Sequence, residues 1–172
     1  MITKANNHNP GGTNYPVIFF AKIITTFFFL GYLPLIPGTF GSAAGLLIFA
    51  LLESNSYLLF LCTLFILTLG FLLSGKVAVL FKRRDPPQIV IDEIGGMLVS
   101  FLALPPGQAG PSGNGKLIML IGFIVFRVLD AVKLFPANRF HHRKGSLGIM
   151  GDDLVAGIYT NLILRFLITF LL

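Results

Sequence analysis

Six apolar segments, joined by short polar linkers, limit what this chain can fold into. They cover residues 17–36, 42–52, 57–73, 91–104, 117–129 and 154–172. Hydrophobic residues make up 55% of the 172-residue chain and charged residues only 12%, whereas soluble domains carry about 25% charged residues. This pattern excludes an ordinary soluble globule. It predicts an all-α fold, a small polytopic bundle of membrane helices.

Several of these segments are shorter than the roughly 17–25 residues of a usual span, which predicts short or interrupted helices whose polar ends reach a recessed site. Segment 42–52 spans only if the loop before it, residues 34–41, is covered by protein. Segment 17–36 either crosses the bilayer or lies in the interface with Lys22 reaching toward water. Both alternatives for that segment remain open.

The domain organisation is simple. Residues 1–16 are polar, hold Lys4 as their one basic residue and lack the pattern of a cleaved signal, so we expect a flexible polar amino terminus. Residues 17–172 form a single membrane-embedded domain, because the length suits one domain of about 100–200 residues. Cys62 is the only cysteine, which excludes an intramolecular disulfide and a cysteine-rich metal site. The oligomeric state is left open.

Basic residues are distributed unevenly between the linkers. Eight of them fall in linkers 76–88 and 131–150, against the single Lys116 in linkers 53–56 and 105–116. By the positive-inside rule the first two linkers face the cytoplasm, and alternation along the chain puts loop 34–41 on the same side. The net charge of +6 therefore indicates a basic face beside membrane lipid and not a nucleic-acid partner. The eight residues are Lys76, Lys82, Arg83, Arg84, Lys133, Arg139, Arg143 and Lys144.

Two acidic pairs each precede an apolar segment. Asp92 and Glu93 begin the first, Asp152 and Asp153 the second, and small residues follow both pairs. One alternative is helix capping, because carboxylates are favoured at helix amino termini. The other is a divalent cation, because carboxylates near a bilayer are costly unless a positive charge compensates them. Two pairs in one short chain favour the cation.

A third acidic residue, Asp130, lies between Arg127 and Lys133 at intervals of three, which places all three on one helical face. They form either a local ladder of ion pairs or part of the same site as the acidic pairs. In the second case Asp130 joins the carboxylates as a metal ligand, and Arg127 and Lys133 bind an anionic substrate. Oxygen-rich clusters of this kind suit Mg²⁺ completed by substrate phosphate, so we expect phosphoryl chemistry.

The glycine-containing loop at residues 37–42 adds hydroxyl groups at a helix start. Gly38 and Gly41 allow close approach of the backbone to a ligand, and Thr39 and Ser42 carry the hydroxyls. Taken alone it is as well explained by an ordinary helix-entry turn. The basic stretch 139–145 is interpreted as a loop that contacts lipid headgroups.

Four ordered motifs in this chain resemble phosphatidylglycerophosphatase A. They are Pro-Gly-Thr-Phe-Gly-Ser at 37–42, Ile-Asp-Glu-Ile-Gly-Gly-Met at 91–97, Phe-Arg-Val-Leu-Asp-Ala-Val-Lys at 126–133 and Gly-Ile-Met-Gly-Asp-Asp-Leu-Val-Ala-Gly at 148–157. The resemblance runs from about residue 33 to the carboxyl terminus. The family's motifs can be placed on this chain by position. Its Asp-Glu pair corresponds to Asp92 and Glu93, its Asp-x-x-Lys motif to Asp130 and Lys133, and its Asp-Asp pair to Asp152 and Asp153. Its Pro-Gly-Thr threonine corresponds to Thr39.

The resemblance implies a bacterial inner-membrane, multi-pass, Mg²⁺-dependent phosphatase with its active site facing the cytoplasm. Its substrate would be phosphatidylglycerol phosphate, converted to phosphatidylglycerol and phosphate in phospholipid biosynthesis. Two positions depart from the family: Leu134 stands where proline is usual, and His141 where aspartate is usual. These departures concern loop 134–146 and its role, not the acidic motifs.

Several alternatives stay open at this stage. Turnover by an activated water and turnover through an aspartyl phosphate are both compatible with the motifs. A phosphotransferase that joins lipid to alcohol is disfavoured, since the Asp-x-x-Asp-Gly-x-x-Ala-Arg pattern expected there is absent. A non-catalytic cation transporter or lipid-binding protein is the remaining alternative. Its acids would lie in the middle of the spans, along a pathway.

Overall fold

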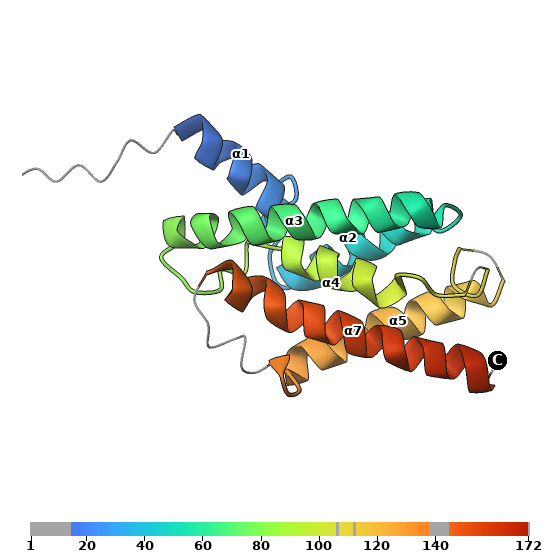
Figure 1. Cartoon of the computed structure of the whole chain (residues 1–172). Helices are drawn as coiled ribbons and strands as arrows, with labels where there is room; N and C mark the ends of the chain where they lie inside the picture. Colours follow the sequence, from blue (N-terminus) through green and yellow to red (C-terminus); the bar gives the residue numbers. More distant parts are fainter. Residues whose placement is uncertain (1–14, 106, 112, 138–144, 172) are drawn as a thin grey trace, which may run out of the picture.

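Helices make up all the regular structure in the part of the chain that is described. The computed structural model describes residues 15–105, 107–111, 113–137 and 145–171 (Figure 1). Within them no strand occurs, so the predicted all-α class is confirmed. The elements are α1 (Tyr15–Thr25), the 3-10 helix η1 (Leu30–Tyr32), α2 (Pro37–Leu52), α3 (Ser56–Leu80), α4 (Ile91–Phe101), α5 (Gly115–Val132) and α7 (Ser146–Leu171).

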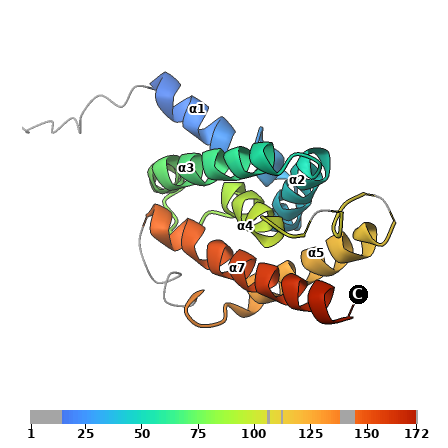
Figure 2. The same cartoon turned by 45° about the vertical axis from the view of Figure 1, so that its right-hand side comes forward.

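The short helix α4 lies at the centre of the bundle. Helices α2, α3, α5 and α7 all contact it, as Figures 1 and 2 show. Nine of its 11 residues are buried. At about 1.5 Å per residue α4 is far shorter than the roughly 30 Å hydrocarbon core. Segment 91–104 thus owes its apolar character to burial within protein, whereas we had expected a span there.

In the described part of the chain two helices are long and apolar enough to cross a membrane: α3, over Ser56–Leu80, and α7, over Ser146–Phe170. Both extend beyond their expected bounds. The first continues past residue 73 to Leu80, and the second begins eight residues before residue 154. The Ser146 hydroxyl accepts a hydrogen bond from the Gly75 amide at 2.9 Å. This bond ties the start of α7 to the end of α3.

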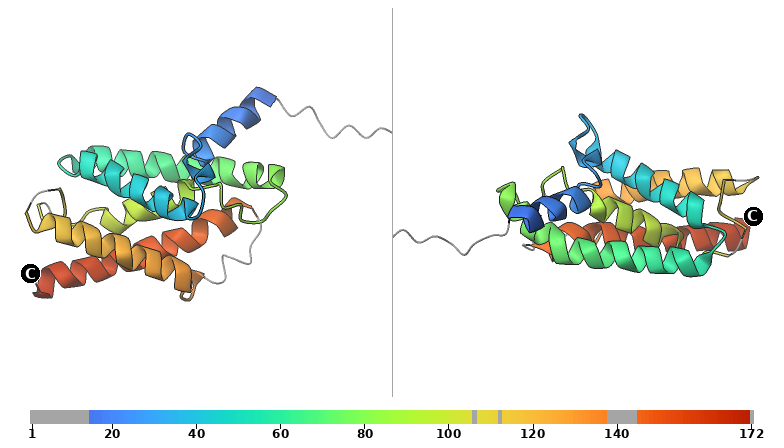
Figure 3. Two further views of the ribbon diagram at one scale, coloured as in Figure 1. Left: turned by 180° about the vertical axis from the view of Figure 1, so that it is seen from behind. Right: turned by 90° about the horizontal axis from the view of Figure 1, so that it is seen from above.

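Segment 17–36 is not one continuous helix. Helix α1 ends at Thr25, and Phe27, Phe28 and Phe29 follow with positive φ before η1 begins. The helix packs on α3 and projects from the rest of the bundle (Figure 3). Its carboxyl end matters to the core, because the Thr25 carbonyl accepts a hydrogen bond from the Val90 amide at 3.0 Å, just before α4.

Glycines allow the helices to approach α4 at backbone distance. A Cβ atom at Gly157 of α7 would collide with the Gly96 carbonyl oxygen of α4. A Cβ at Gly96 would lie 2.7 Å from the Asp153 carbonyl oxygen, and one at Gly45 of α2 would lie 2.9 Å from the Ile94 carbonyl oxygen. The small residues after each acidic pair therefore serve close helix packing, as such residues do between membrane helices.

We expect Gly157→Ala to destabilise the bundle. The new methyl group meets backbone, which cannot rotate away, and overpacking of this kind costs about 1–3 kcal/mol. The free energy or midpoint of unfolding in detergent measures the effect. Ile158→Ala is the matched control, since Ile158 is 49% exposed and a surface change alters stability by only about 0.5 kcal/mol. Equal stability of the two variants would contradict the proposed packing.

Candidate active site

One polar cavity of about 400 Å³ lies at the end of the bundle where α2 and α7 begin and α5 ends. We call it the carboxylate cavity. Its walls come from four helices and from the linker that precedes α4, so the four motifs, far apart in sequence, meet in one place. Its charged and hydroxyl-bearing lining residues are Thr39, Asp85, Asp92, Glu93, Arg127, Asp130, Lys133, Asp152 and Asp153.

Three carboxylates form the tightest group in this cavity. Asp92, Glu93 and Asp153 each offer an oxygen, and these oxygens all lie within 4.8 Å of one another. Asp92 is 5% exposed and Asp153 is 4% exposed. Among the described residues, Oδ1 of Asp92 and Oε2 of Glu93 are buried without a hydrogen-bond partner. Such orphaned acceptors are costly, and a bound cation satisfies them.

The helix position of the second acidic pair argues against capping as the reason for both pairs. Asp92 and Glu93 do lie in the first turn of α4, as expected. The expectation that the second pair begins a helix is wrong: α7 starts at Ser146, and its first turn holds no acid. Asp152 and Asp153 therefore lie inside the helix, where the backbone amides are already used. Their burial there serves the cavity.

The predicted ladder on α5 forms only in part. Arg127 and Asp130 make an ion pair at 2.8 Å. Lys133 ends the helix in a left-handed conformation, and its Nζ pairs at 2.5 Å with Asp152 of α7. Arg127 and Lys133 thus bring two cations, each with 28% of its side chain exposed, to the edge of the carboxylate group.

The loop at the start of α2 divides into lining and supporting residues. Gly38 and Thr39 line the cavity, and a Cβ at Gly38 would lie 2.5 Å from Oε1 of Glu93. Gly41 and Ser42 do not line it. The Ser42 hydroxyl donates to the Gly38 carbonyl at 2.9 Å and accepts from Nη1 of Arg127 at 3.4 Å, while Gly41 packs against Val90. The expected role of both residues in substrate binding stays a prediction; in the structure Ser42 contacts Gly38 and Arg127, which line the cavity.

One acidic residue of the cavity escaped the sequence analysis. Asp85 lines the wall, and its charge raises the pKa of both Asp92 and Lys133. In the sequence it follows three basic residues, so the linker was interpreted as basic only. The available signal was Pro86-Pro87 directly after it, because consecutive prolines favour a turn that leads the chain back toward α4.

Burial dominates the electrostatics of the carboxylates. It raises the pKa of Asp92 well above its usual range, and the charge of Glu93 raises it further. Burial also raises the pKa of Glu93. For Lys133 burial acts downward, but the hydrogen bond and charge of Asp152 outweigh it, so the pKa lies above its ordinary value. Lys133 is therefore charged at neutral pH, and a bound cation would favour the ionised forms of Asp92 and Glu93.

The donor set fits a hard divalent cation. Six carboxylates face two cationic side chains in the carboxylate cavity, which leaves an excess of negative charge in a buried site. Mg²⁺ is bound through oxygen atoms, with one or two carboxylates and substrate phosphate in its shell. Asp92, Glu93 and Asp153 offer such oxygens.

Comparison with known proteins identifies the family. The sequence model of the family phosphatidylglycerophosphatase A matches residues 23–168. The chain belongs to this family. The match includes every residue that lines the carboxylate cavity.

Three relatives illustrate the similarity. The phosphatidylglycerophosphatase A of Escherichia coli is 33% identical over 139 residues, 80% of this chain and 77% of its own. That of Haemophilus influenzae is 34% identical over 128 residues, 72% of this chain and 73% of its own. A Bacteroides thetaiotaomicron protein, whose name proposes a phosphatidylinositol-3-phosphatase, is 29% identical over 147 residues, 83% of this chain and 89% of its own. No solved structure matches the chain.

Part of the basic loop predicted from sequence lies outside the described residues. This applies to Arg139, His141, Arg143 and Lys144, so the interpretation of that stretch as a headgroup-contacting loop stays a prediction. The departure at Leu134 does fall in the described part. Leu134 follows Lys133 and lies at the outer surface, 44% exposed.

We expect Asp92→Asn to make the metal-free protein more stable, not less. The amide keeps the shape of the side chain and cannot ionise, so at a pH above the raised pKa of Asp92 it removes one repelling buried charge, a change of about 1–3 kcal/mol. Unfolding midpoints in EDTA measure it. In excess Mg²⁺ the wild type should gain stability by ligand binding, and the variant should gain less.

The pH dependence gives the sign of this effect. The folded-state pKa of Asp92 is raised, so between the ordinary carboxyl pKa and the raised pKa the folded protein binds more protons than the unfolded chain. The metal-free wild type therefore loses stability as the pH rises through this range. The advantage of Asp92→Asn should widen over the same range. Glu53→Gln is the control, because it removes a charge outside the cavity. A constant or shrinking difference would contradict the assignment.

Proposed function

We propose that this protein hydrolyses phosphatidylglycerol phosphate to phosphatidylglycerol and inorganic phosphate, a step of phospholipid biosynthesis. The family assigns the activity. The observation that carries the proposal at the level of residues is the group of three carboxylates, of which Asp92 and Asp153 are buried and Asp92 and Glu93 each have a buried oxygen without a hydrogen-bond partner. Arg127 and Lys133 lie beside this group in the same cavity, as a phosphomonoester requires.

Mg²⁺ is the proposed cofactor, held by Asp92, Glu93 and Asp153, with Asp130 and Asp152 at the edge of the group. A metal held there would supply positive charge beside the phosphate oxygens and Lewis acidity for the attacking group. The protein's own residues contribute by holding the carboxylates and the two cationic side chains in place. Gly38 leaves room beside Glu93, and the ion pairs of Asp130 and Asp152 keep two cations at fixed places.

The cationic side chains have separate roles in this proposal. Arg127 offers planar donors that suit two phosphate oxygens at once, and Lys133 offers a compact charge that is retained at neutral pH. The Thr39 hydroxyl, in the first turn of α2, lies where a helix amino terminus favours anions. These groups stabilise the negative charge of the transferred phosphoryl group in its transition state.

We further propose that the carboxylate cavity opens at the cytoplasmic side of the bacterial inner membrane, in a multi-pass arrangement. The distribution of basic residues along the linkers supports this orientation. The two long apolar helices support membrane attachment. All predicted site residues that line the cavity do so at one end of the bundle, as a site at the membrane interface requires.

The non-catalytic alternative, a cation or lipid transporter, is less well supported. A transport pathway needs ionisable groups spread along the depth of the membrane. In the described part of the chain the acidic residues other than Glu53 line the carboxylate cavity. They lie in the linker before α4, in the first turn of α4, in the last turn of α5 and in the second turn of α7. They mark one site and no pathway.

The direct test is phosphate release from phosphatidylglycerol phosphate by purified protein in Mg²⁺ and in EDTA. We expect release only with the metal. Asp153→Asn should lower kcat by at least about a hundredfold, the order of loss when one electrostatic group of a preorganised site is removed, while the protein stays folded. Asp92→Asn should behave in the same way. Metal-independent release, or retained activity in both variants, would refute the proposed metal site.

Two further measurements sharpen that test. The first is phosphate release from phosphatidylinositol 3-phosphate in the same micelles, the substrate suggested by the name of the Bacteroides relative. Faster phosphate release from this lipid than from phosphatidylglycerol phosphate would correct the proposed substrate. Solvent ¹⁸O in the released phosphate, combined with trapping of any phosphoenzyme, separates activated water from an aspartyl phosphate.

Labelling of single cysteines tests the orientation. In a Cys62→Ser background, Lys82→Cys should react with a membrane-impermeant maleimide only from the cytoplasmic side, and Lys116→Cys only from the opposite side. Both lysines are exposed, so accessibility depends on the side of the membrane. Labelling of both positions from the same side would contradict the proposed topology.

A further inference from the structure

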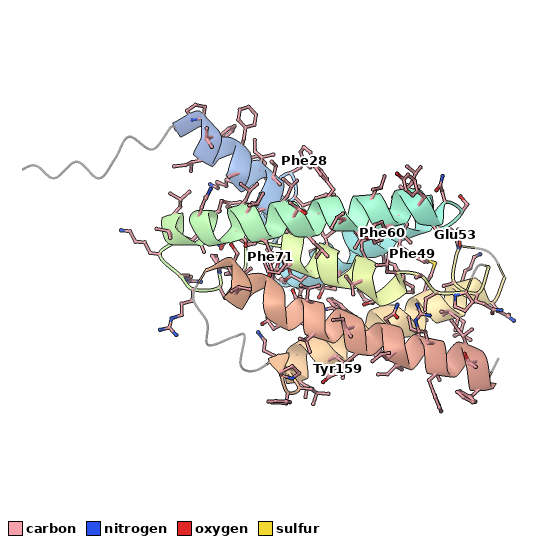
Figure 4. All side chains as sticks on the ribbon, in the orientation of Figure 1. Phe28, Phe49, Glu53, Phe60, Phe71 and Tyr159 are labelled. Carbon is pink, nitrogen blue, oxygen red and sulfur yellow. The ribbon has the colours of Figure 1, made fainter. Side chains whose placement is uncertain are left out.

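A second, apolar hollow adjoins the carboxylate cavity. It is an open groove of about 460 Å³ between the carboxyl end of α5 and the middle of α7. We call it the α5–α7 groove. Figure 4 shows Tyr159 on α7 beside the end of α5. The groove is lined by Leu129, Leu134, Phe135, Tyr159, Leu162 and Ile163.

The groove and the carboxylate cavity meet at the last turn of α5. Leu129 lines the groove and the next residue, Asp130, lines the cavity; Lys133 lines the cavity and Leu134 lines the groove. On α7 the groove residue Tyr159 follows Asp152 by seven residues, which is two turns and about 10 Å along the same face. The polar site thus continues directly into an apolar surface.

The groove has the chemistry of a site for a hydrocarbon chain. Its one hydroxyl group, on Tyr159, donates to the Phe135 carbonyl at 2.8 Å, so this polar group is already satisfied. The remaining walls are aliphatic and aromatic side chains. Helix α7 is one of the two candidate membrane helices, and Leu162 is 57% exposed on it, so the groove opens where lipid would lie.

We propose that the α5–α7 groove binds one acyl chain of the anionic phospholipid whose phosphate group lies in the carboxylate cavity. This inference rests on the proposed function and adds a chain-binding subsite to it. The two hollows together are complementary to one amphiphile: Arg127 and Lys133, with a metal if the carboxylates hold one, would meet its phosphate, and apolar walls continue from the same turn of α5. Chain binding here aligns the headgroup with the carboxylates.

Another apolar cavity, of about 230 Å³, provides a control within the same molecule. It lies between α1, α3 and α4, is lined among others by Phe28 and Ile94, and shares no lining residue with the α5–α7 groove. Like the α5–α7 groove, it adjoins the carboxylate cavity at two pairs of sequence neighbours, here Ile91 with Asp92 and Glu93 with Ile94 on α4. It is therefore the competing site for an acyl chain, and the experiments below distinguish the two.

Filling the groove tests the proposal by kinetics. Ile163→Trp places an indole in the groove, and Ile158→Trp, five residues away and outside it, is the matched control. Substrates are phosphatidylglycerol phosphates with hexanoyl or palmitoyl chains in mixed micelles. We expect the palmitoyl-to-hexanoyl ratio of kcat/KM to fall about tenfold in Ile163→Trp, since a few methylene groups lose their burial. The fall should lie mainly in KM, and the control should keep the wild-type ratio.

Fluorescence tests chain binding without turnover. The chain has no tryptophan, so each of three variants introduces a single indole. Phe135→Trp places it in the groove, Phe28→Trp in the other apolar cavity, and Phe166→Trp on α7 outside both. Phosphatidylglycerol phosphate with dibrominated acyl chains, added in EDTA, should quench Phe135→Trp saturably. The other two should show only weak, non-saturating quenching.

The outcomes separate this proposal from the function beneath it. An unchanged chain-length ratio in Ile163→Trp, or saturable quenching at Phe28→Trp in place of Phe135→Trp, overturns the groove while wild-type turnover still supports the phosphatase. If the wild type releases no phosphate from either substrate, the proposed function fails. Saturable quenching at Phe135→Trp would then still establish the lipid site, and its absence would refute it.

Discussion

The contact between α4 and α7 is the interaction on which the site depends. At Gly96 and Gly157 the two helices approach so closely that a single methyl group would meet backbone. This approach brings Asp153 of one helix within 4.8 Å of Asp92 and Glu93 of the other, measured between their carboxylate oxygens. Without glycine at this crossing the helices would separate, and the carboxylates with them.

The same contact has a cost that explains the surrounding charges. Carboxylates gathered in a buried site repel one another and raise their own pKa values, so the metal-free site opposes the packing that creates it. Arg127 and Lys133 relieve part of this repulsion through Asp130 and Asp152. A bound cation would relieve the remaining repulsion. The carboxylates that suit the site for a cation therefore lower the stability of the metal-free protein, a trade-off between stability and activity.

Much of the fold and site followed from the sequence, for identifiable reasons. The all-α class came from apolar segments, and the lining residues Asp92, Glu93, Asp130, Asp152 and Asp153 from the rarity of charge in such a chain. Helix bounds were less accurate. The early start of α7 was missed because the whole of 131–150 was assigned to a basic linker, whereas the Ser146 hydroxyl accepts a hydrogen bond from the Gly75 amide of α3. Asp85 was hidden by its basic neighbours.

The sequence by itself indicated most of the charged residues that line the carboxylate cavity, because a charged side chain is costly in an apolar chain unless other groups compensate it. Only the tertiary structure decided how these residues are arranged. It separated Gly38 and Thr39, which line the cavity, from Gly41 and Ser42, which hold neighbours in place, and it paired Lys133 with Asp152 instead of with its own helix. Such choices depend on which helices cross and how closely, and no local pattern records the distance between residues on different helices.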